Sequence, residues 1–323
     1  MAPQSYYLGG KIRATDFNGF ANDINEIVGI GAGDSGYGQN QLVIPTVASG
    51  TKINASHMQL LLTALKFAGR HQGTTILSPD DSSDPGYPQS GNLIELIPNI
   101  ETDIPNVRSN KLNFDLAMMT INQNVISSTK TYVPSGQAGD VWDSNVTYEV
   151  SVIFTNSDAR RHFFNTGGEL RLDTTFVASY TDKQSLDWQA LFAAVGMVKI
   201  SHNITEVTGG TGTPGGGFTS LTTTYQKLYE KAGGGLYAGY YANNKYEIYA
   251  RLNGNNAIDL RLDFLDTHVA DTGNSYPSGP WTGQDYVAGT LTAQIDVQRA
   301  DDQDISGNGV VIPSPTFSHI SEL

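Results

Sequence analysis

The hydrophobic pattern of the chain changes its period near residue 146. Before that point, apolar residues recur at the three- and four-residue spacing of amphipathic helices. After it, apolar and polar residues alternate, as they do along half-buried strands. The pattern predicts an α+β, mainly β protein, in which a small helical N-terminal unit is followed by a β-sandwich (jelly-roll-like) domain.

Three helices are expected in the first part of the chain. One covers residues 16–28 and is ended by Gly29, and a second covers residues 55–68 and is followed by Gly69. Two such short apolar stripes are expected to pack on the β domain or on a neighbouring subunit. A third helix is expected over residues 113–126, where apolar residues again have helical spacing: Phe114, Met118, Ile121 and Val125. Between them, residues 73–110 look irregular because five prolines interrupt any regular ladder: Pro79, Pro85, Pro88, Pro98 and Pro105.

The second half predicts at least six strands separated by turns. Alternating residues indicate strands at 146–154, 170–176, 198–207, 246–252, 258–264 and 291–297. Asn253-Gly254-Asn255-Asn256 is a strong hairpin signal. A short helix capped by Ser185 and ended by Gly196 interrupts the strands, and residues 221–231 fit either a helix or a strand.

This pattern divides the chain into four parts. They are a helical N-terminal assembly unit (1–75), an irregular connector with one helix (76–145), the β-sandwich domain (146–300) and an extended C-terminal tail (301–323).

Composition agrees with a strand-rich protein. Only 16% of the 323 residues are charged and 35 are glycine, which is typical of many strands joined by turns. The net charge of -13 disfavours nucleic acid as a partner. The chain has no cysteine, which excludes disulfides and zinc–thiolate sites. We expect no secretion signal at the N-terminus and no membrane partner, because no apolar run has membrane-spanning length.

The motifs that usually carry chemistry are weak or in the wrong context. Gly31-Ala-Gly33-Asp-Ser-Gly36 matches the dinucleotide pattern, but a helix precedes it where a strand is required, so a flexible turn is expected. Two acidic clusters could hold calcium: Asp80, Asp81 and Asp84, and Asp301, Asp302 and Asp304. The second cluster starts like a calcium loop but has Pro313 where a glutamate is needed. We therefore expect no cofactor, no metal and no catalytic residue.

Three aromatic residues near loops, Tyr276, Trp281 and Tyr286, could form a platform for a glycan, because sugar faces stack on flat rings. The same residues lie among Pro277 and Pro280, so they could equally hold a loop in place. A glycan-degrading enzyme is a further alternative, which would need two carboxylic acids converging in a cleft.

Residues 160–168 predict an interface. Arginine is favoured at interfaces because its planar fork makes paired hydrogen bonds. Two consecutive phenylalanines on one strand cannot both face inward, so one should lie on a bend or face a partner. Gly167 and Gly168 permit positive φ or a close backbone approach. The predicted interface comprises Arg160, Arg161, Phe163, Phe164, Asn165, Gly167 and Gly168; the alternative is a turn with two exposed charges.

The run from Arg161 to Arg171, Arg-His-Phe-Phe-Asn-Thr-Gly-Gly-Glu-Leu-Arg, is the most distinctive in the chain. It resembles virion structural proteins of tailed bacteriophages, especially T4-like phages of cyanobacteria. The resemblance continues in other short segments: Gly36-Tyr-Gly-Gln39, His71-Gln-Gly73, Gly196-Met-Val with the Trp188 region, the Tyr-rich stretch to Leu252, and Ile305-Ser-Gly-Asn-Gly-Val310. It implies a particle component from the tail, baseplate or fibre region.

The leading hypothesis is a non-enzymatic structural component of a phage virion, assembled in the host cytoplasm. It would make subunit contacts in a symmetric tail, baseplate or neck assembly, with other virion proteins and copies of itself as partners. The N-terminal unit and the C-terminal tail are the expected contact regions. The alternative is a carbohydrate-binding, fibre-type host-recognition module whose partner is a host surface glycan, or a capsid-associated decoration or fibre protein.

Overall fold

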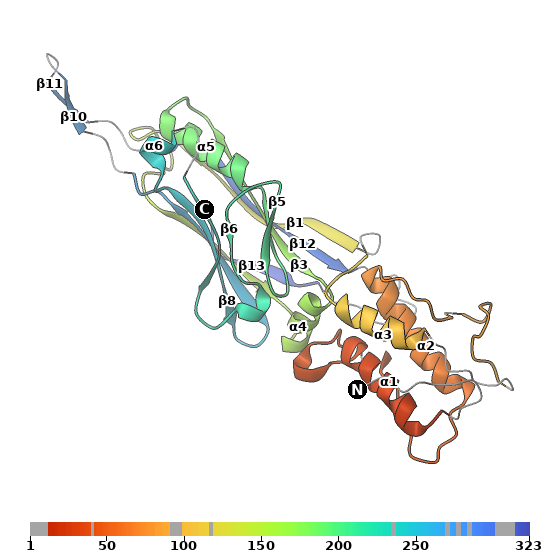
Figure 1. The fold of residues 1–323 in the computed structure, drawn as a ribbon. Coiled ribbons are helices and arrows are strands. Elements are labelled where there is room, and N and C mark those ends of the chain that lie inside the picture. The colour runs from red at the N-terminus through yellow and green to blue at the C-terminus, as the bar shows by residue number, and fades with distance from the viewer. Residues whose placement is uncertain are drawn as a thin grey trace. The chain divides into compact units, whose positions relative to one another are not determined.

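The computed structural model describes residues 12–39, 42–79, 81–90, 99–115, 119–233, 237–268, 272–275, 279–282, 286–300 and 314–323 (Figure 1). The chain forms two compact units. The first comprises residues 1–120, 158–168 and 299–314, and the second comprises residues 121–157, 169–298 and 315–323. The chain therefore passes between the units five times, after residues 120, 157, 168, 298 and 314.

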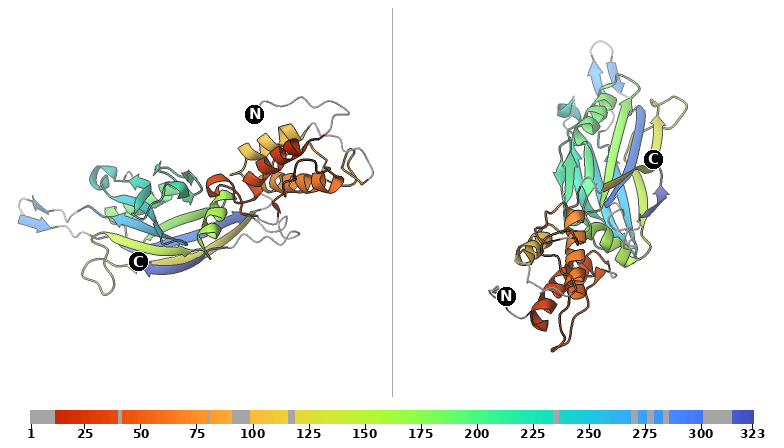
Figure 2. Two further views of the ribbon diagram at one scale, coloured as in Figure 1. Left: turned by 90° about the horizontal axis from the view of Figure 1, so that it is seen from below. Right: turned by 90° about the vertical axis from the view of Figure 1, so that its right-hand side faces the viewer.

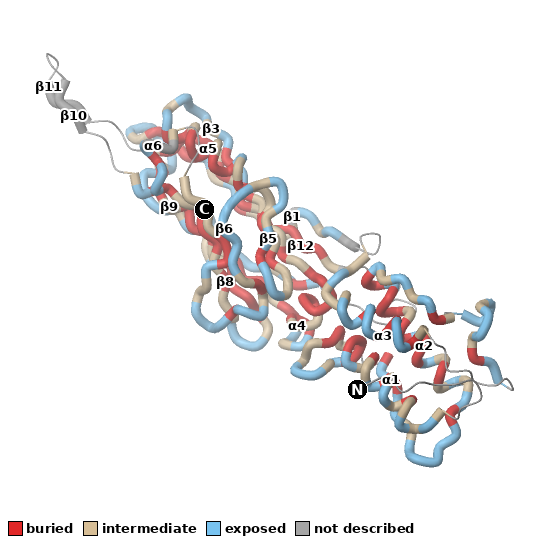
Figure 3. Tube along the Cα trace, viewed as in Figure 1, coloured by how far each residue is buried: buried red, intermediate tan, exposed pale blue. Residues whose placement is uncertain are grey.

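The first unit is built on three helices, α1 (Ala14–Val28), α2 (Ala55–Gln72) and α3 (Ile100–Ser109). Each helix contacts the other two. Their apolar faces form one core, in which the largest fully buried members include Phe17, Ile24, Leu61, Leu65 and Ile104. The two stripes found in the sequence are thus buried against each other and against α3, inside this unit (Figure 3).

Helix α2 is longer than the sequence pattern indicates. It continues through Gly69 and ends at Gly73, whose φ of 69° gives the left-handed cap. Gly69 lies inside the helix. A Cβ at this position would be 2.4 Å from a side-chain carbon of Ile76, so no larger residue fits there. The glycine therefore permits close packing of the following segment and does not stop the helix.

Helix α3 lies in the stretch that its prolines were expected to keep irregular, so that expectation is wrong there. Pro105 lies inside it, and the helix is held by what it buries: Ile100, Ile104 and Val107 face the core. The buried carboxylate of Asp103 accepts hydrogen bonds from the backbone N–H groups of Leu77 and Ser78. These contacts outweigh the one backbone hydrogen bond that proline removes.

The helix expected over residues 113–126 is wrong. Strand β1 (Met119–Tyr132) occupies most of that range and pairs with β12 (Gly289–Ala300). Hydroxyl pairs link the two strands, Thr129 with Thr292 and Thr131 with Thr290, each at 3.0 Å between the oxygens. The isoleucine, valine and threonine content of this segment favours a strand, and the helical spacing of four apolar residues was accidental.

The second unit is a sandwich of two antiparallel sheets, which confirms the expected fold class (Figures 1 and 2). The five-stranded sheet has the order β1-β12-β3-β4-β5, with β3 (Glu169–Ala178), β4 (Met197–Ile200) and β5 (Thr205–Thr208). The six-stranded sheet has the order β13-β2-β9-β8-β7-β6. Its strands are β2 (Val146–Ile153), β6 (Thr213–Pro214), β7 (Gln226–Ala232), β8 (Lys245–Asn253), β9 (Ala257–Leu265) and β13 (Thr316–Ser321).

The remaining elements are short. Strands β10 (Thr272–Ser275) and β11 (Gly279–Thr282) form a separate hairpin. Helix α5 (Lys183–Val195) lies between β3 and β4 in the chain, and α6 (Ala238–Tyr241) between β7 and β8. Two 3-10 turns are η1 (Ala32–Asp34) and η4 (Phe218–Ser220).

Several expected elements are confirmed and some are corrected. The turn at residues 253–256 joins β8 to β9, with Asn253 opposite Ala257. Residues 198–207 form two strands and not one, because the chain turns back between Ile200 and Thr205. Residues 226–232 form a strand, which settles the ambiguous segment. Helix α5 is capped by Asp182, whose side chain accepts from the Ser185 N–H at 2.7 Å, so Ser185 is not the cap.

An aromatic cluster fills the space between the two sheets. Phe176 of β3 packs edge-on against Trp142, with the ring centroids 5.8 Å apart, and Trp142 also meets Phe264 of β9. Helix α5 adds Trp188 and Phe192 to this cluster, and Phe192 contacts Tyr246 of β8 and Phe264. The hydroxyl groups of Tyr246 and Thr174 are 2.9 Å apart and link the sheets. Burial of these rings is the main stabilising contribution to the sandwich.

Phe176 and Val177 offer a matched test of this core, because they are neighbours on β3 with opposite exposure. Phe176 is 4% exposed and Val177 is 64% exposed. We expect Phe176→Ala to lower the free energy of unfolding by about 3–5 kcal/mol, since it removes a buried ring and leaves a cavity. Val177→Ala should cost less than about 1 kcal/mol. Chemical denaturation followed by tryptophan fluorescence measures both, and equal losses would contradict this description of the core.

Candidate functional site: a buried lock and an outer-face ladder

The segment from Arg161 to Gly168 is the end of a helix followed by a turn, not a strand. Helix α4 (Ser157–Asn165) belongs to the first unit from Asp158 onward. Phe163 and Phe164 are both fully buried, with their rings 5.0 Å apart in an edge-to-face contact. Successive residues on a helix are separated by about 100°, so both can be enclosed at once. The two phenylalanines are therefore not consecutive on a strand, which was the premise of the prediction that one of them lies on a bend or faces a partner.

The two glycines after α4 have the roles expected from the sequence. Gly167 has φ 86°, and a Cβ there would lie 2.4 Å from the Phe114 ring. A Cβ on Gly168 would lie 2.4 Å from the carbonyl oxygen of Phe163, to which the Gly168 N–H donates a hydrogen bond. A side chain at either position would push the turn away from its contacts.

The Gly-rich loop at residues 31–38 receives α4. The carbonyl oxygen of Gly36 accepts hydrogen bonds from His162 Nδ1 at 3.1 Å and Asn165 Nδ2 at 2.8 Å. Asn165 Nδ2 also donates to the carbonyl oxygen of Asp34. At Gly38, with φ 71°, any Cβ would overlap the His162 ring. This loop is therefore a socket with fixed partners, and the expectation of a flexible turn is wrong.

The end of α2 completes the same network. His71, 3% exposed, donates its Nε2–H to the carbonyl oxygen of Thr166 at 2.9 Å. Its ring packs on Tyr37 with a centroid distance of 4.9 Å. The Tyr37 hydroxyl donates to the carbonyl oxygen of Lys111 and accepts from Gln72 Nε2 at 2.6 Å. Three segments singled out in the sequence thus meet in one place, which we call the lock: Gly36, Tyr37, Gly38, His71, Gln72, His162, Asn165 and Thr166.

Burial controls the protonation of the lock. It lowers the pKa of His71 to about 4, against a partial opposing effect of the hydrogen bond to Thr166. Burial also lowers the pKa of His162 and raises that of the Tyr37 hydroxyl. At neutral pH both imidazoles are uncharged, so the network consists of neutral hydrogen bonds.

The predicted interface residues lie on α4 and its following turn. Phe163, Phe164 and Asn165 are buried in the chain itself, and Arg160 is only 7% exposed. Arg161 keeps a partly exposed side chain and pairs with Asp158 and with Asp34, the latter at 3.3 Å. A contact of Arg161 with another subunit stays a prediction.

The expected glycan platform and acidic clusters lie largely outside the described residues: Tyr276, Asp80, Asp301, Asp302 and Asp304. Trp281 occupies a position on β11 opposite Gly273. Tyr286 is half-buried, and burial raises the pKa of its hydroxyl. Asp81 accepts hydrogen bonds from the Ser83 N–H and hydroxyl, which lower its pKa. In the described part of the chain, no group of three or more potential metal-ligating side chains gathers, and no helix there is both long and apolar enough to cross a bilayer.

The outer face of the six-stranded sheet carries an ordered row of cations and aromatic rings. Arg251 lies 4.5 Å from the Tyr225 ring centroid, and Arg261 lies 4.6 Å from the centroids of both Tyr225 and Tyr249. Lys227 Nζ follows at 5.9 Å from the Tyr249 centroid. These five side chains, Arg251, Tyr225, Arg261, Tyr249 and Lys227, form an alternating stack that we call the outer-face ladder. Each contact is a weak attraction at such an exposed site.

Carboxylates beneath the ladder hold its cations. Asp259, which is fully buried, accepts from Arg251 Nε and Nη2 at 3.0 and 2.9 Å, and Asp263 accepts from Arg261 Nε at 3.0 Å. Glu149 accepts from the Tyr225 hydroxyl at 3.0 Å. The cations are therefore fixed in position before any other molecule approaches this face.

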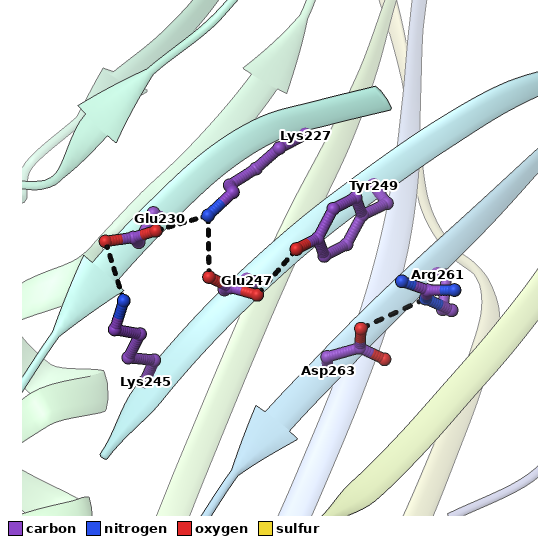
Figure 4. Close-up of polar contacts among 7 residues, drawn as sticks. All are labelled: Lys227, Glu230, Lys245, Glu247, Tyr249, Arg261 and Asp263. Carbon is purple, nitrogen blue, oxygen red and sulfur yellow. Dashed lines mark hydrogen bonds and ion pairs between the residues drawn. The ribbon is translucent and has the colours of Figure 1, made fainter. Parts of the chain in front are cut away.

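Three acidic residues lie side by side across neighbouring strands. Glu247 of β8 is directly opposite both Glu230 of β7 and Asp263 of β9. Figure 4 shows Lys227 bridging Glu230 and Glu247, with Nζ–oxygen distances of 2.5 and 2.8 Å, and Lys245 approaching Glu230. The contact with Lys227 is the main cause that lowers the pKa of Glu230 to about 2. A register shift between Lys227 and Tyr229 places Lys227 and Glu230 on the same face.

The face has little net charge to attract a small ion. Lys227, Lys245, Arg251 and Arg261 supply four positive charges, and Glu149, Glu230, Glu247, Asp259 and Asp263 supply five negative charges. What the arrangement provides is a rigid tyrosine and arginine surface, and these residue types dominate binding at protein interfaces.

The sequence analysis missed this face, although the signal was present. Only the apolar positions of β8 and β9 were used to predict these strands, and the polar residues between them were not compared across the turn. The hairpin turn at residues 253–256 sets the register, and this register brings Arg251 opposite Asp259 and Tyr249 opposite Arg261. Pairing the polar residues across the predicted turn would have found most of the ladder.

No family model, curated protein or solved structure matches the chain.

The buried His71 makes the stability of the lock depend on pH. Its pKa is about 4 when folded and 6.5 in its ordinary state, so the unfolded chain binds the proton more readily. Stability from this group is therefore complete above about pH 6.5 and falls as the pH is lowered toward 4, by up to about 3 kcal/mol. Urea unfolding between pH 7 and 4 measures it against His71→Gln, which stays neutral. Identical pH profiles of the two proteins would contradict the assignment.

Lys227→Met tests the row of carboxylates. Without the bridging cation, Glu230 faces Glu247 directly, and we expect the pKa of Glu230 to rise by about one to two units. Lys231→Met is the matched control on the same strand, because Lys231 Nζ contacts the Thr211 hydroxyl and neither carboxylate. NMR titration of the glutamate side chains measures both variants. An unchanged Glu230 in Lys227→Met would show that Lys227 does not hold this carboxylate.

Proposed function

We propose that the chain is a non-enzymatic structural component of a tailed-phage virion. It would make subunit contacts in a symmetric tail, baseplate or neck assembly, with copies of itself and other virion proteins as partners. The observation that carries this proposal is the lock. The segments with the resemblance to phage structural proteins, at residues 36–39, 71–73 and 161–168, join each other in one buried network.

The chemistry of the lock supports a mechanical role. Its side chains use their hydrogen-bonding groups on main-chain carbonyls and on each other, and its histidine and tyrosine are shielded from solvent. Residues spent in this way determine a fold and do not meet a substrate. The segments that give the sequence its phage-like character are therefore explained by structure.

The path of the chain between the two units also supports a structural role. Five crossings between the units mean that the connection does not depend on a single linker. A force applied to one unit is carried to the other through several covalent segments, one of which, α4, is anchored by the lock. A permanent component of a particle needs such a connection.

The outer-face ladder is the surface on which we place one of the subunit contacts. Its arginines and tyrosines are held in one geometry by buried carboxylates, which reduces the entropy lost when a partner binds. The glycan-binding alternative rests on Tyr276, Trp281 and Tyr286 and stays a prediction.

The test of this proposal is the composition of purified particles. We expect quantitative mass spectrometry to find the chain in mature virions as an integer multiple of the particle symmetry, retained after a high-salt wash. A non-virion protein from the same lysate serves as the control and should fall with each purification step. If the chain falls in parallel with that control, it is not a virion component.

A further inference from the structure

The C-terminal strand β13 is attached to its sheet mainly through its main chain. It pairs antiparallel with β2, so that Phe317 lies opposite Val152 and Ser318 opposite Ser151. Four of its six residues are exposed, including Ile320 at 49%. Main-chain hydrogen bonds between two strands are the same whether the strands come from one chain or from two, because the same N–H and C=O groups pair in either case.

Side chains add few contacts to this strand. The Tyr148 hydroxyl and His319 Nδ1 are 3.3 Å apart, and Thr316 Oγ1 donates to the carbonyl oxygen of Ile153 at 3.4 Å. The Leu323 N–H donates to Ser128 Oγ on β1 at 3.1 Å. The groups that receive β13 thus come from β1 and β2, the strands at one side of the sandwich. That side would receive the same strand equally well from another copy.

The connection to β13 does not determine which sheet it joins. The preceding strand, β12, lies in the other sheet, and fifteen residues separate Ala300 from Thr316. Fully extended, a connection of this length reaches about 50 Å, whereas six strands side by side span only about 29 Å. By length alone, fifteen residues can reach the β2 edge of the same chain or that of a copy beside it.

We propose that, in the assembled protein, β13 of each copy pairs with β2 of a neighbouring copy and completes that copy's six-stranded sheet. This inference rests on the symmetric assembly proposed above and names the contact that builds it. Each copy donates one strand and accepts one, an arrangement that a reciprocal two-fold dimer and a closed head-to-tail ring both satisfy. Copies already held beside one another present their β2 edges at high effective concentration, so exchange competes with pairing inside one chain.

The absence of natural cysteine makes a direct test clean. Residues 151 and 318 are directly opposite, so cysteines at both positions are within disulfide reach. We would co-express two differently tagged chains, one with Ser151→Cys and one with Ser318→Cys, oxidise the purified oligomer and examine it on non-reducing gels. Strand exchange predicts a disulfide-linked pair containing both tags, up to the level that random mixing of the two chains allows, which is about half of the protein. Within a single chain this bond cannot form.

Thr147→Cys in place of Ser151→Cys is the matched control. It lies on the same strand and face, about 13 Å further along, and should give no link to Ser318→Cys. The double variant in one chain completes the test: exchange gives covalent oligomers, whereas an intrachain disulfide in a monomer-sized band overturns the proposal. An oligomer that contains only intrachain disulfides would contradict strand exchange without contradicting the structural role. The composition of purified particles tests that role separately.

Discussion

The carbonyl group of Gly36 is the acceptor on which the arrangement of the first unit depends. A carbonyl oxygen has two lone pairs, and here His162 and Asn165 take both. Both donors are on α4, a helix that the chain contributes between two strands of the sandwich. Loss of this acceptor would remove the hydrogen bond of His162, at a cost of about 1–3 kcal/mol, and would leave Asn165 with only its bond to the carbonyl oxygen of Asp34. The glycine is required as well, because a Cβ at position 36 would lie 2.2 Å from the carbonyl oxygen of Gly29.

The sequence alone predicts the elements whose pattern is local and strong. The stripe of α1, the alternation in β2, β8 and β9, and the hairpin turn at residues 253–256 were readable because each follows one period without interruption. Helix α3 was not, because its proline is compensated by burial of Ile104 and by the contacts of Asp103. Strand β1 was assigned as a helix because four apolar residues happen to have helical spacing, whereas its β-branched residues and its distant pairing with β12 give a strand.

The candidate site shows the same division between local and distant information. Gly36-Tyr-Gly-Gln39, His71-Gln-Gly73 and the run from Arg161 each stood out in the sequence. That they meet is a property of the tertiary fold, since the hydrogen bond from His71 to Thr166 spans 95 residues. Distinctive residues therefore marked the right positions but suggested the wrong environment, a surface in place of an interior. The outer-face ladder is the converse case. Its residues do not stand out in the sequence, and only the strand register brings their side chains together.

The path of the chain through its two units has a consequence for the order of synthesis. The helices α1, α2 and α3 leave the ribosome first, but the socket at residues 31–38 remains empty until Thr166 has been made. The six-stranded sheet is completed later still, because its edge strand β13 follows β12 in the chain. Neither unit can therefore mature before much of the other exists, and a polypeptide released early would have a half-built helical unit and an open sheet edge.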